Sequence, residues 1–513
     1  MFTMKKEKIT KIVEIIFSIY IACVLYLSIF KTLNYIIILP FVSIMSYKTI
    51  QKVGEGDFER NLFDNSETES VSLKQSVIWF LIILIGHFFY WLAYYPGGFN
   101  LDALGQWDQA HGLMQLNNWH PVLTTAIYWI LTRIVDNLAF CIGIQLIAFS
   151  GSVVFLLSEL VQRKVRKVFL WFVVLFTALN PAIAMNNVCL IKDVPFTILI
   201  CIIFGYYLKI DRTNGEWLES ILNVCILCIL LIMLMMVRHN AIFFTIPFVI
   251  FTMLIYRKQL KQIVVVLIMS FGIVAILEGP VFSMLHIEQH SNVIGESVGI
   301  PMAAMVNALL NDSNNCPEET RQFLLNIATE KEWEEHYIVG EWDSCKWVFG
   351  GIELLKEEKL TDIISLSIKT FIKCPNAIYS SVRENTRVIW QVIGKSEWTT
   401  WIYIEKNDFG IIEEYNPWCR NVILDIKSLS KQVPLNIFSW EIGSSIVAFF
   451  ICLIRLCRAG RVKSGVFIIA ILFYDFMTMC LLCGPSFRYF YLNLVLVVPI
   501  LALTFGVYYE KEI

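Results

Sequence analysis

Long apolar runs separated by short polar connections occupy most of the chain. A helix needs about 20 predominantly apolar residues to cross a lipid bilayer, so this pattern predicts an all-α polytopic membrane protein. We expect about twelve transmembrane helices, near residues 12–30, 33–48, 76–95, 138–159, 168–187, 194–209, 219–237, 241–256, 263–282, 437–457, 464–483 and 489–508.

One apolar segment, residues 121–135, is shorter than the others. Counting it as a thirteenth crossing would move the basic cluster at 163–167 to the outer side of the membrane. We therefore favour a helix that lies in, or dips into, the outer leaflet, and a thirteenth crossing is the alternative.

Basic residues determine the predicted orientation. The clusters at 5–11, 163–167, 257–261 and 455–463 all fall on one side of the predicted membrane. The positive-inside rule assigns that side to the cytoplasm. We expect a multi-pass protein of the cytoplasmic membrane with both termini in the cytoplasm.

Composition supports this class. Hydrophobic residues make up 57% of the chain and charged residues only 16%, whereas soluble domains carry about 25% charge. An ordinary soluble protein is therefore excluded. The net charge of −2 is uninformative about partners, and no nucleic-acid partner is expected.

The pattern divides the chain into four parts. Residues 1–75 form a membrane hairpin and a polar cytoplasmic loop, and residues 76–282 form a membrane core whose first outer loop is 96–120. Residues 283–436 are the one sizeable hydrophilic region, and their apolar spacing of three to four residues predicts a mainly helical extracytoplasmic domain. Residues 437–513 return to the membrane.

Four cysteines of the hydrophilic region are candidates for disulfides, although their spacing does not prove any pairing: Cys316, Cys345, Cys374 and Cys419.

The first outer loop carries the most concentrated chemistry. It contains Asp102, Asp108 and His120 beside an apolar run. A carboxylate at a lipid–water boundary is costly unless it has a partner or a task, which makes it a functional candidate. The alternative for Asp102 is that it caps the N-terminus of a surface helix.

Further polar motifs fall at the predicted outer ends of other spans, and they contain Lys192, Asp193, Arg238, His239, Arg488 and Tyr489. Cations on this face can bind a phosphate through charge-assisted hydrogen bonds, and a carboxylate can act as a base toward a hydroxyl. Each motif also has a structural alternative. Lys192 and Asp193 can form a simple interfacial pair, His120-Pro121 can begin a helix, and the arginines can be snorkelling anchors.

Two other features leave alternatives open. Asp102 and Asp193 are the candidates for a shared divalent cation, but two acids are a weak metal motif, so metal dependence stays open. Tryptophans of the hydrophilic region are expected mainly in the core or at the interface, and stacking on sugar rings is a minority alternative for each: Trp333, Trp342, Trp347, Trp390, Trp398, Trp401, Trp418 and Trp440.

With these motifs, the chain resembles a bacterial branch of the GT-C superfamily, polytopic glycosyltransferases that use polyprenyl-phosphate sugars. Relatives include protein mannosyltransferases and aminoarabinose transferases. Asp102 in FNLDALGQWDQA matches the acid of the first outer loop, and His120-Pro121-Val122-Leu123 resembles the His-Pro-Pro-Leu that follows it, without the second proline. Asp193 in LIKDVPFTILI matches the second outer acid, and Arg488-Tyr489 matches a pair near the last spans.

The resemblance covers residues 76–282 and 437–508, and it has two departures. The hydrophilic region precedes the last three spans instead of following them, and Asp102 is not part of an Asp-Glu pair. The resemblance implies a GT-C fold but does not identify the sugar or the acceptor.

From the motifs and the resemblance we expect a membrane glycosyltransferase. It would move a monosaccharide from a polyprenyl phosphate to a glycan, lipid or protein acceptor outside the membrane. Asp102 would be the base, and Lys192, Arg238 and Arg488 would hold the phosphate. Supporting roles fall to Asp108, His120, Asp193, His239 and Tyr489. The alternatives are a lipid-linked sugar flippase or transporter, a polysaccharide polymerase or ligase, and a non-enzymatic scaffold.

Overall fold

The computed structural model describes residues 2–54, 71–289, 293–348, 355, 358–394 and 399–507. Within these ranges every regular element is a helix, and extended pairing occurs only as isolated bridges. The all-α prediction is therefore confirmed for the described part of the chain. Most of the predicted cytoplasmic loop, and Trp398, lie outside the described residues.

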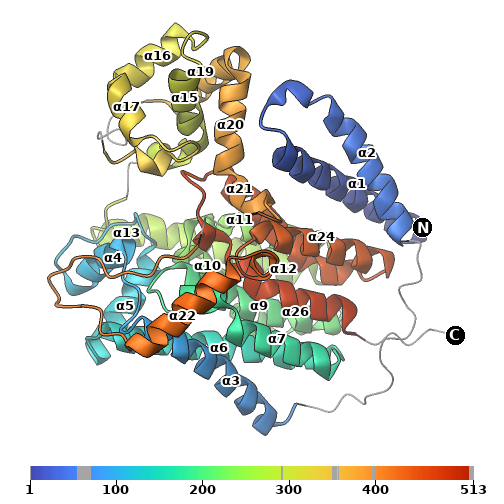
Figure 1. The fold of residues 1–513 in the computed structure, drawn as a ribbon. Coiled ribbons are helices and arrows are strands. Elements are labelled where there is room, and N and C mark those ends of the chain that lie inside the picture. Colours follow the sequence, from blue (N-terminus) through green and yellow to red (C-terminus); the bar gives the residue numbers. More distant parts are fainter. Residues whose placement is uncertain are drawn as a thin grey trace.

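A bundle of apolar helices forms the body of the protein (Figure 1). Pairs that are distant in sequence pack together, including α6 with α9, α11 with α25 and α24 with α26. The bundle helices are α1 (Phe2–Ile29), α2 (Ile38–Gly54), α3 (Leu73–Ala93), α6 (Leu138–Gln162), α7 (Lys167–Leu179), α8 (Pro181–Asn187), α9 (Asp193–Arg212), α10 (Ile221–Val237), α11 (Ile242–Ile255), α12 (Leu260–Ile276), α24 (Ile442–Arg458), α25 (Val466–Met479) and α26 (Leu492–Phe505).

Seven helical stretches of the described chain are long and apolar enough to cross a membrane. The number becomes eight if α7 and α8, which are bent by 57° at Asn180, form one broken span. The seven are Glu7–Ile29, Leu73–Ala93, Leu138–Gln162, Asp193–Arg212, Arg257–Met284, Val462–Met479 and Phe487–Phe505. The described structure therefore contains fewer helices of full crossing length than the twelve or so spans that the sequence predicts.

The remaining predicted spans are shorter helices. α10 has 17 residues and α11 has 14, both below the ~20 residues of a typical crossing. Helix α5 (Val122–Ile134), which covers the ambiguous segment, has 13 residues. At 1.5 Å per residue it extends only about 20 Å, so it is too short to cross a hydrocarbon layer of about 30 Å alone.

The outer surface of the bundle is apolar, as expected for a membrane protein. On α12, for example, Ile268 is 62% exposed, and on α3 Ile85 is 63% exposed. Soluble proteins rarely expose contiguous apolar surface of this kind. The exposed side chains therefore indicate a body embedded in lipid.

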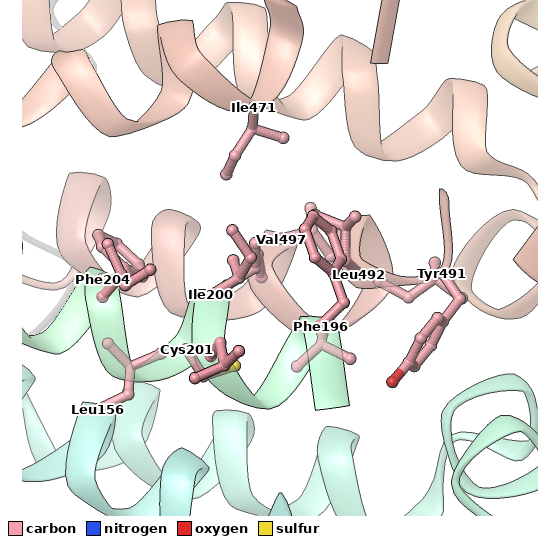
Figure 2. Packing of buried hydrophobic residues seen from close by; sticks show 14 of the residues in the cluster. Leu156, Phe196, Ile200, Cys201, Phe204, Ile471, Tyr491, Leu492 and Val497 are labelled. Carbon is pink, nitrogen blue, oxygen red and sulfur yellow. The ribbon is translucent and has the colours of Figure 1, made fainter. Parts of the chain in front are cut away.

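The interior of the bundle is closely packed. Figure 2 shows side chains from α6, α9, α25 and α26 meeting, among them Leu156, Phe204 and Val497. Phe204 also stacks on Phe467, with 4.3 Å between ring centroids. Since lipid tails are as apolar as these side chains, such close van der Waals contact, rather than escape from water, holds membrane helices together.

Segments predicted to be cytoplasmic share one end of the bundle. Arg163 pairs with Asp211 at 2.8 Å, and Arg458 pairs with Glu14 at 2.6 Å. Arg163 also donates to Ser464. The first turn of α1 and the C-terminal end of α26 lie at this end in Figure 1. These contacts support the predicted common location of the basic connections, whichever side of the membrane they occupy.

The opposite end carries short surface helices and a separate helical lobe, residues 293–385, which has its own apolar core (Figure 1). The surface helices are α4 (Leu101–His111), α5, α13 (Phe282–Met284) and α22 (Pro417–Ser430). The lobe contains α14 (Val293–Ser297), α15 (Gly299–Asn311), α16 (Glu318–Leu325), α17 (Glu330–His336), α19 (Leu360–Lys373) and α20 (Pro375–Asn385).

The predicted hydrophilic domain therefore has two parts. After the lobe, α21 (Arg387–Trp390) and α22 pack on the bundle, with α22 against α3. The short α23 (Asn436–Ser439) then leads into α24. The four candidate cysteines of this region are free thiols, and none forms a disulfide in the described structure.

Candidate functional site

The backbone of the first outer loop is held between two distant segments. Gly98 N–H donates to Val188 at 2.8 Å, and Phe99 N–H donates to Tyr403 at 2.8 Å. Gly97 has φ of +134°, a region that favours glycine. A side chain at Gly98 would also meet Cys189, 2.6 Å from its Cβ. The Pro-Gly-Gly sequence thus allows the close backbone approach that fixes the start of α4.

Helix α4 places Asp102 in its first turn, but Asp102 does not cap the helix. The N-cap is Asn100, whose side chain accepts from the backbone N–H of Ala103 at 3.0 Å. The alternative prediction, that Asp102 caps the N-terminus of this helix, is therefore wrong. Its carboxylate stays available, and the helix N-terminus favours the ionised form.

Asp102 pairs with Arg488 across the molecule. Arg488 Nη1 lies 2.7 Å from Asp102 Oδ2. His120 Nε2 lies 3.8 Å from the other oxygen, Oδ1. The side chain of Asp102 remains 32% exposed, so an incoming molecule can reach it.

Lys192 completes this group from the residue before α9. Its Nζ lies 3.0 Å from His120 Nδ1. Because an ammonium only donates, Nδ1 accepts and the imidazole proton is on Nε2, facing Asp102. Lys192 has no carboxylate within 4 Å in the described part of the chain. We call Asp102, His120, Lys192 and Arg488 the site cluster.

A second acid–arginine pair lies beside the site cluster. Asp193 and Arg238 form an ion pair in which their side chains are only 1% and 4% exposed. The Arg238 guanidinium also lies 4.7 Å from the ring centroid of Tyr489, and Arg488 lies 5.3 Å from the same ring. Tyr489 therefore contacts both arginines by cation–π interaction and links the two pairs.

Two other predicted residues take peripheral positions. His239 Nε2 contacts the carbonyl of Asn118 at 3.2 Å, beside the loop that carries His120. Asp108 does not join the site cluster. Its ionisable neighbours are Asp408 and His111, and burial together with the Asp408 carboxylate raises the pKa of Asp108.

Burial and the mutual charges of the site cluster shift the pKa values of its members. Burial alone would raise the pKa of Asp102, but the nearby cations Arg488 and Lys192 hold the pKa of that carboxyl well below its usual range. Burial and the Lys192 ammonium lower the pKa of His120 to about 3. Burial lowers the pKa of Lys192 to about 8. At neutral pH the site cluster thus holds one anion, two cations and a neutral imidazole.

A cavity of about 350 Å³ adjoins Arg488. Asn186 and Thr399 line it, and the Asn186 Oδ1 and Thr399 Oγ1 atoms have no hydrogen-bond partner within the described structure although both residues are buried. Trp401 also lines the cavity and is 79% exposed. The cavity therefore offers polar groups and an aromatic face next to a guanidinium.

Asp102 and Asp193, the candidates for a shared cation, lie in two different ion pairs. Each is paired with an arginine, and neither belongs to a group of three or more ligating side chains in the described ranges. One such group does occur, formed by Glu296, Asp343 and Cys483. Lys346 already places its ammonium 2.7 Å from Glu296 and 2.6 Å from Asp343, so a cation is present there without a metal.

Asn186 and most of the segment 399–403, which line the cavity beside Arg488, carry no distinguishing pattern in the sequence. Asn186 lies in α8, inside an apolar run, and residues 399–403 are in a connection without periodic pattern. Only Trp401 carried a signal, as one of several candidate aromatic residues.

No family model matches this chain, and no significantly similar curated protein or solved structure was found.

Proposed function

We propose that this protein transfers a monosaccharide from a polyprenyl-phosphate donor to an envelope acceptor, at the end of the bundle that carries the site cluster. The observation that supports it most is the convergence of Asp102, His120, Lys192 and Arg488. They come from four separated segments and meet beside a polar cavity at the ends of apolar helices. This GT-C-like assignment also rests on the sequence resemblance.

In this proposal the phosphate of the donor binds Arg488 and Lys192. Guanidinium and ammonium groups form strong, charge-assisted bonds with phosphate. Lys192 has no carboxylate partner among the described residues, so its charge is available for a ligand. The lipid tail of the donor would lie along the apolar surface of the bundle.

Asp102 would act as the base. The acceptor hydroxyl gives its proton to the carboxylate while its oxygen attacks the anomeric carbon, and the bond from that carbon to the phosphate oxygen breaks. Polyprenyl phosphate leaves with the bonding electrons, and Lys192 and Arg488 stabilise its charge. The proton then passes from Asp102 to solvent.

The low pKa of Asp102 is compatible with this role. A carboxylate held by two cations is a weak base. A bound phosphate offsets the charge of Arg488 and Lys192, so the pKa of Asp102 rises when the donor is present. The site would then gain basicity when its substrate arrives.

The other predicted residues take different parts. Because Arg238 is buried in its pair with Asp193, we assign it a positioning role through Tyr489 instead of direct phosphate binding. His120 orients Asp102 and Lys192. The cavity with Trp401 accommodates a sugar ring, where an aromatic face can stack and unpaired polar atoms can accept or donate hydrogen bonds.

The test compares envelope glycans by mass spectrometry in wild-type, deletion, Asp102→Asn and Asp108→Asn strains with matched membrane levels of the protein. Asp108 lies on the same helix but outside the site cluster, which makes it the matched control. We expect the deletion and Asp102→Asn to lose the same sugar mass and Asp108→Asn to retain it.

Two results would contradict this function. If the deletion removes a sugar and Asp102→Asn does not, Asp102 is not the base, and a flippase or a scaffold becomes the better explanation. If the deletion leaves all envelope glycans unchanged, sugar transfer itself is excluded under those growth conditions.

A further inference from the structure

Helix α19 of the lobe presents an apolar stripe that the lobe does not cover. Ile363 and Thr370 are buried in the lobe core. The stripe consists of residues between 41% and 69% exposed, each three or four positions from another member: Leu360, Ile364, Ile368, Phe371 and Ile372. At 100° per residue, this stripe and the buried residues occupy different arcs of the helix.

The third arc of α19 is polar. Asp362, Ser365 and Lys369 are exposed there, and Lys369 pairs with Glu319 of α16. Lys359 precedes the helix and Lys373 ends it. An exposed apolar stripe with lysines at its borders and ends is typical of a helix lying in a membrane interface.

The helix that follows, α20, locates α19 relative to the membrane. The Asn376 side chain accepts from the backbone N–H of Leu33 at 2.9 Å, and the Tyr379 hydroxyl donates to the carbonyl of Phe30 at 2.9 Å. Phe30 and Leu33 directly follow the candidate span that ends at Ile29. Figure 1 shows α20 beside the turn that joins α1 to α2.

The end of α19 is therefore close to the membrane boundary. Lys373 is three residues before Asn376, which contacts the turn after α1. The same turn region exposes Ile36 at 52% and Ile37 at 84%, as expected for side chains that face lipid. A stripe of apolar residues at this level has phospholipid as its nearest apolar environment.

We propose that the exposed stripe of α19 lies on the phospholipid surface of the membrane that α1 crosses. The apolar side chains enter the boundary between head groups and acyl chains, and Lys359 and Lys373 contact lipid phosphates. The lobe is then attached to the membrane at two places, through α20 on the α1–α2 turn and through α19 on the lipid. This inference depends on membrane embedding and is independent of sugar transfer.

The experiment uses the full chain in vesicles of phosphatidylethanolamine and phosphatidylglycerol, with the photoreactive residue p-benzoylphenylalanine at single positions. Phe371→p-benzoylphenylalanine is the most conservative probe, and Ile368→p-benzoylphenylalanine is a second one. Asp362→p-benzoylphenylalanine, on the polar arc, is the matched control. We expect phospholipid adducts by mass spectrometry at 368 and 371, at least fivefold more abundant than at 362.

Three results would overturn the proposal. Equal lipid labelling at 362 and 371 would mean that the stripe has no preference for lipid. A cross-linked dimer from 368 or 371 would assign the stripe to a second copy of this chain, and an adduct with another protein would assign it to a protein partner. The two probe positions protect the test against a single variant that fails to fold.

Discussion

The molecule contains two acid–arginine pairs of the same chemistry, whose arginines both contact Tyr489 but whose environments differ. In the Asp102–Arg488 pair the side chains are 32% and 28% exposed, whereas in the Asp193–Arg238 pair they are 1% and 4% exposed. An exposed pair can exchange partners with a ligand at little cost. A buried pair cannot, because separating it leaves a charge without water. Accessibility, more than residue type, therefore distinguishes a catalytic candidate from a positioning element.

The largest effect is expected from neutralising the exposed acid. Asp102→Asn should lower the transfer rate by about 10²–10⁴, the usual contribution of a general base, while the unfolding temperature in detergent stays close to that of the wild type. The measurement is the turnover of a polyprenyl-phosphate sugar by purified protein. Asp108→Asn is the control and should retain activity. Equal rates in wild type and Asp102→Asn would show that Asp102 is not the base, and the more exposed pair would then have no catalytic role.

Removing one member of the buried Asp193–Arg238 pair should lower the stability of the protein. Arg238→Met leaves Asp193 buried without a partner and should cost about 3–5 kcal/mol of unfolding free energy, measured as a lower unfolding temperature in detergent. The double variant Asp193→Leu/Arg238→Met removes both charges and should recover much of the loss. If the single variant is as stable as the wild type, the pair is not a structural element.

The titration of Lys192 gives a pH prediction. A lysine with a pKa of about 8 is charged below that pH and neutral above it. Donor binding should therefore weaken as pH rises through 8, and kcat/KM for the donor should fall about tenfold per pH unit beyond it. Lys192→Arg keeps its charge in this range and should shift the decline to higher pH. An identical decline in both proteins would exclude Lys192 as its source.

The smallest effect concerns the cavity beside the exposed pair. Trp401→Ala should raise KM for the sugar substrate by about 2–13-fold, as expected for an aromatic contact of about 0.5–1.5 kcal/mol, with kcat nearly unchanged. Trp401→Phe retains an aromatic face and should stay within about twofold of the wild type. A KM unaffected by Trp401→Ala would place the sugar ring elsewhere.

Part of this architecture follows from local patterns in the sequence. Apolar run length predicted an all-helical body, and polar residues at the ends of the runs predicted the components of the site. Of these, Asp102, His120, Lys192 and Arg488 do come together. Asp108 was misleading because six residues of helix turn the side chain by about 240°, to another face from Asp102.

Other features depend on tertiary packing that no local pattern encodes. Arg238 forms an ion pair with Asp193 because the start of α9 lies beside the end of α10, and Lys192 is left without a carboxylate partner in the described structure. The cavity joins Asn186 of α8 to residues 399–403, more than 200 positions later. Seven or eight helices of the described chain have the length of a full crossing, against about twelve predicted spans, since apolar composition does not reveal where a helix ends or bends.

The separation of the Asp102–Arg488 partners has a consequence for biosynthesis. They are 386 positions apart, and Arg488 belongs to the last apolar helix of the described chain. A nascent chain would insert the Asp102 segment early and complete the pair only after almost every other helix is in the membrane. Truncated or misassembled chains would therefore lack a site, and catalytic competence would coincide with the completion of assembly.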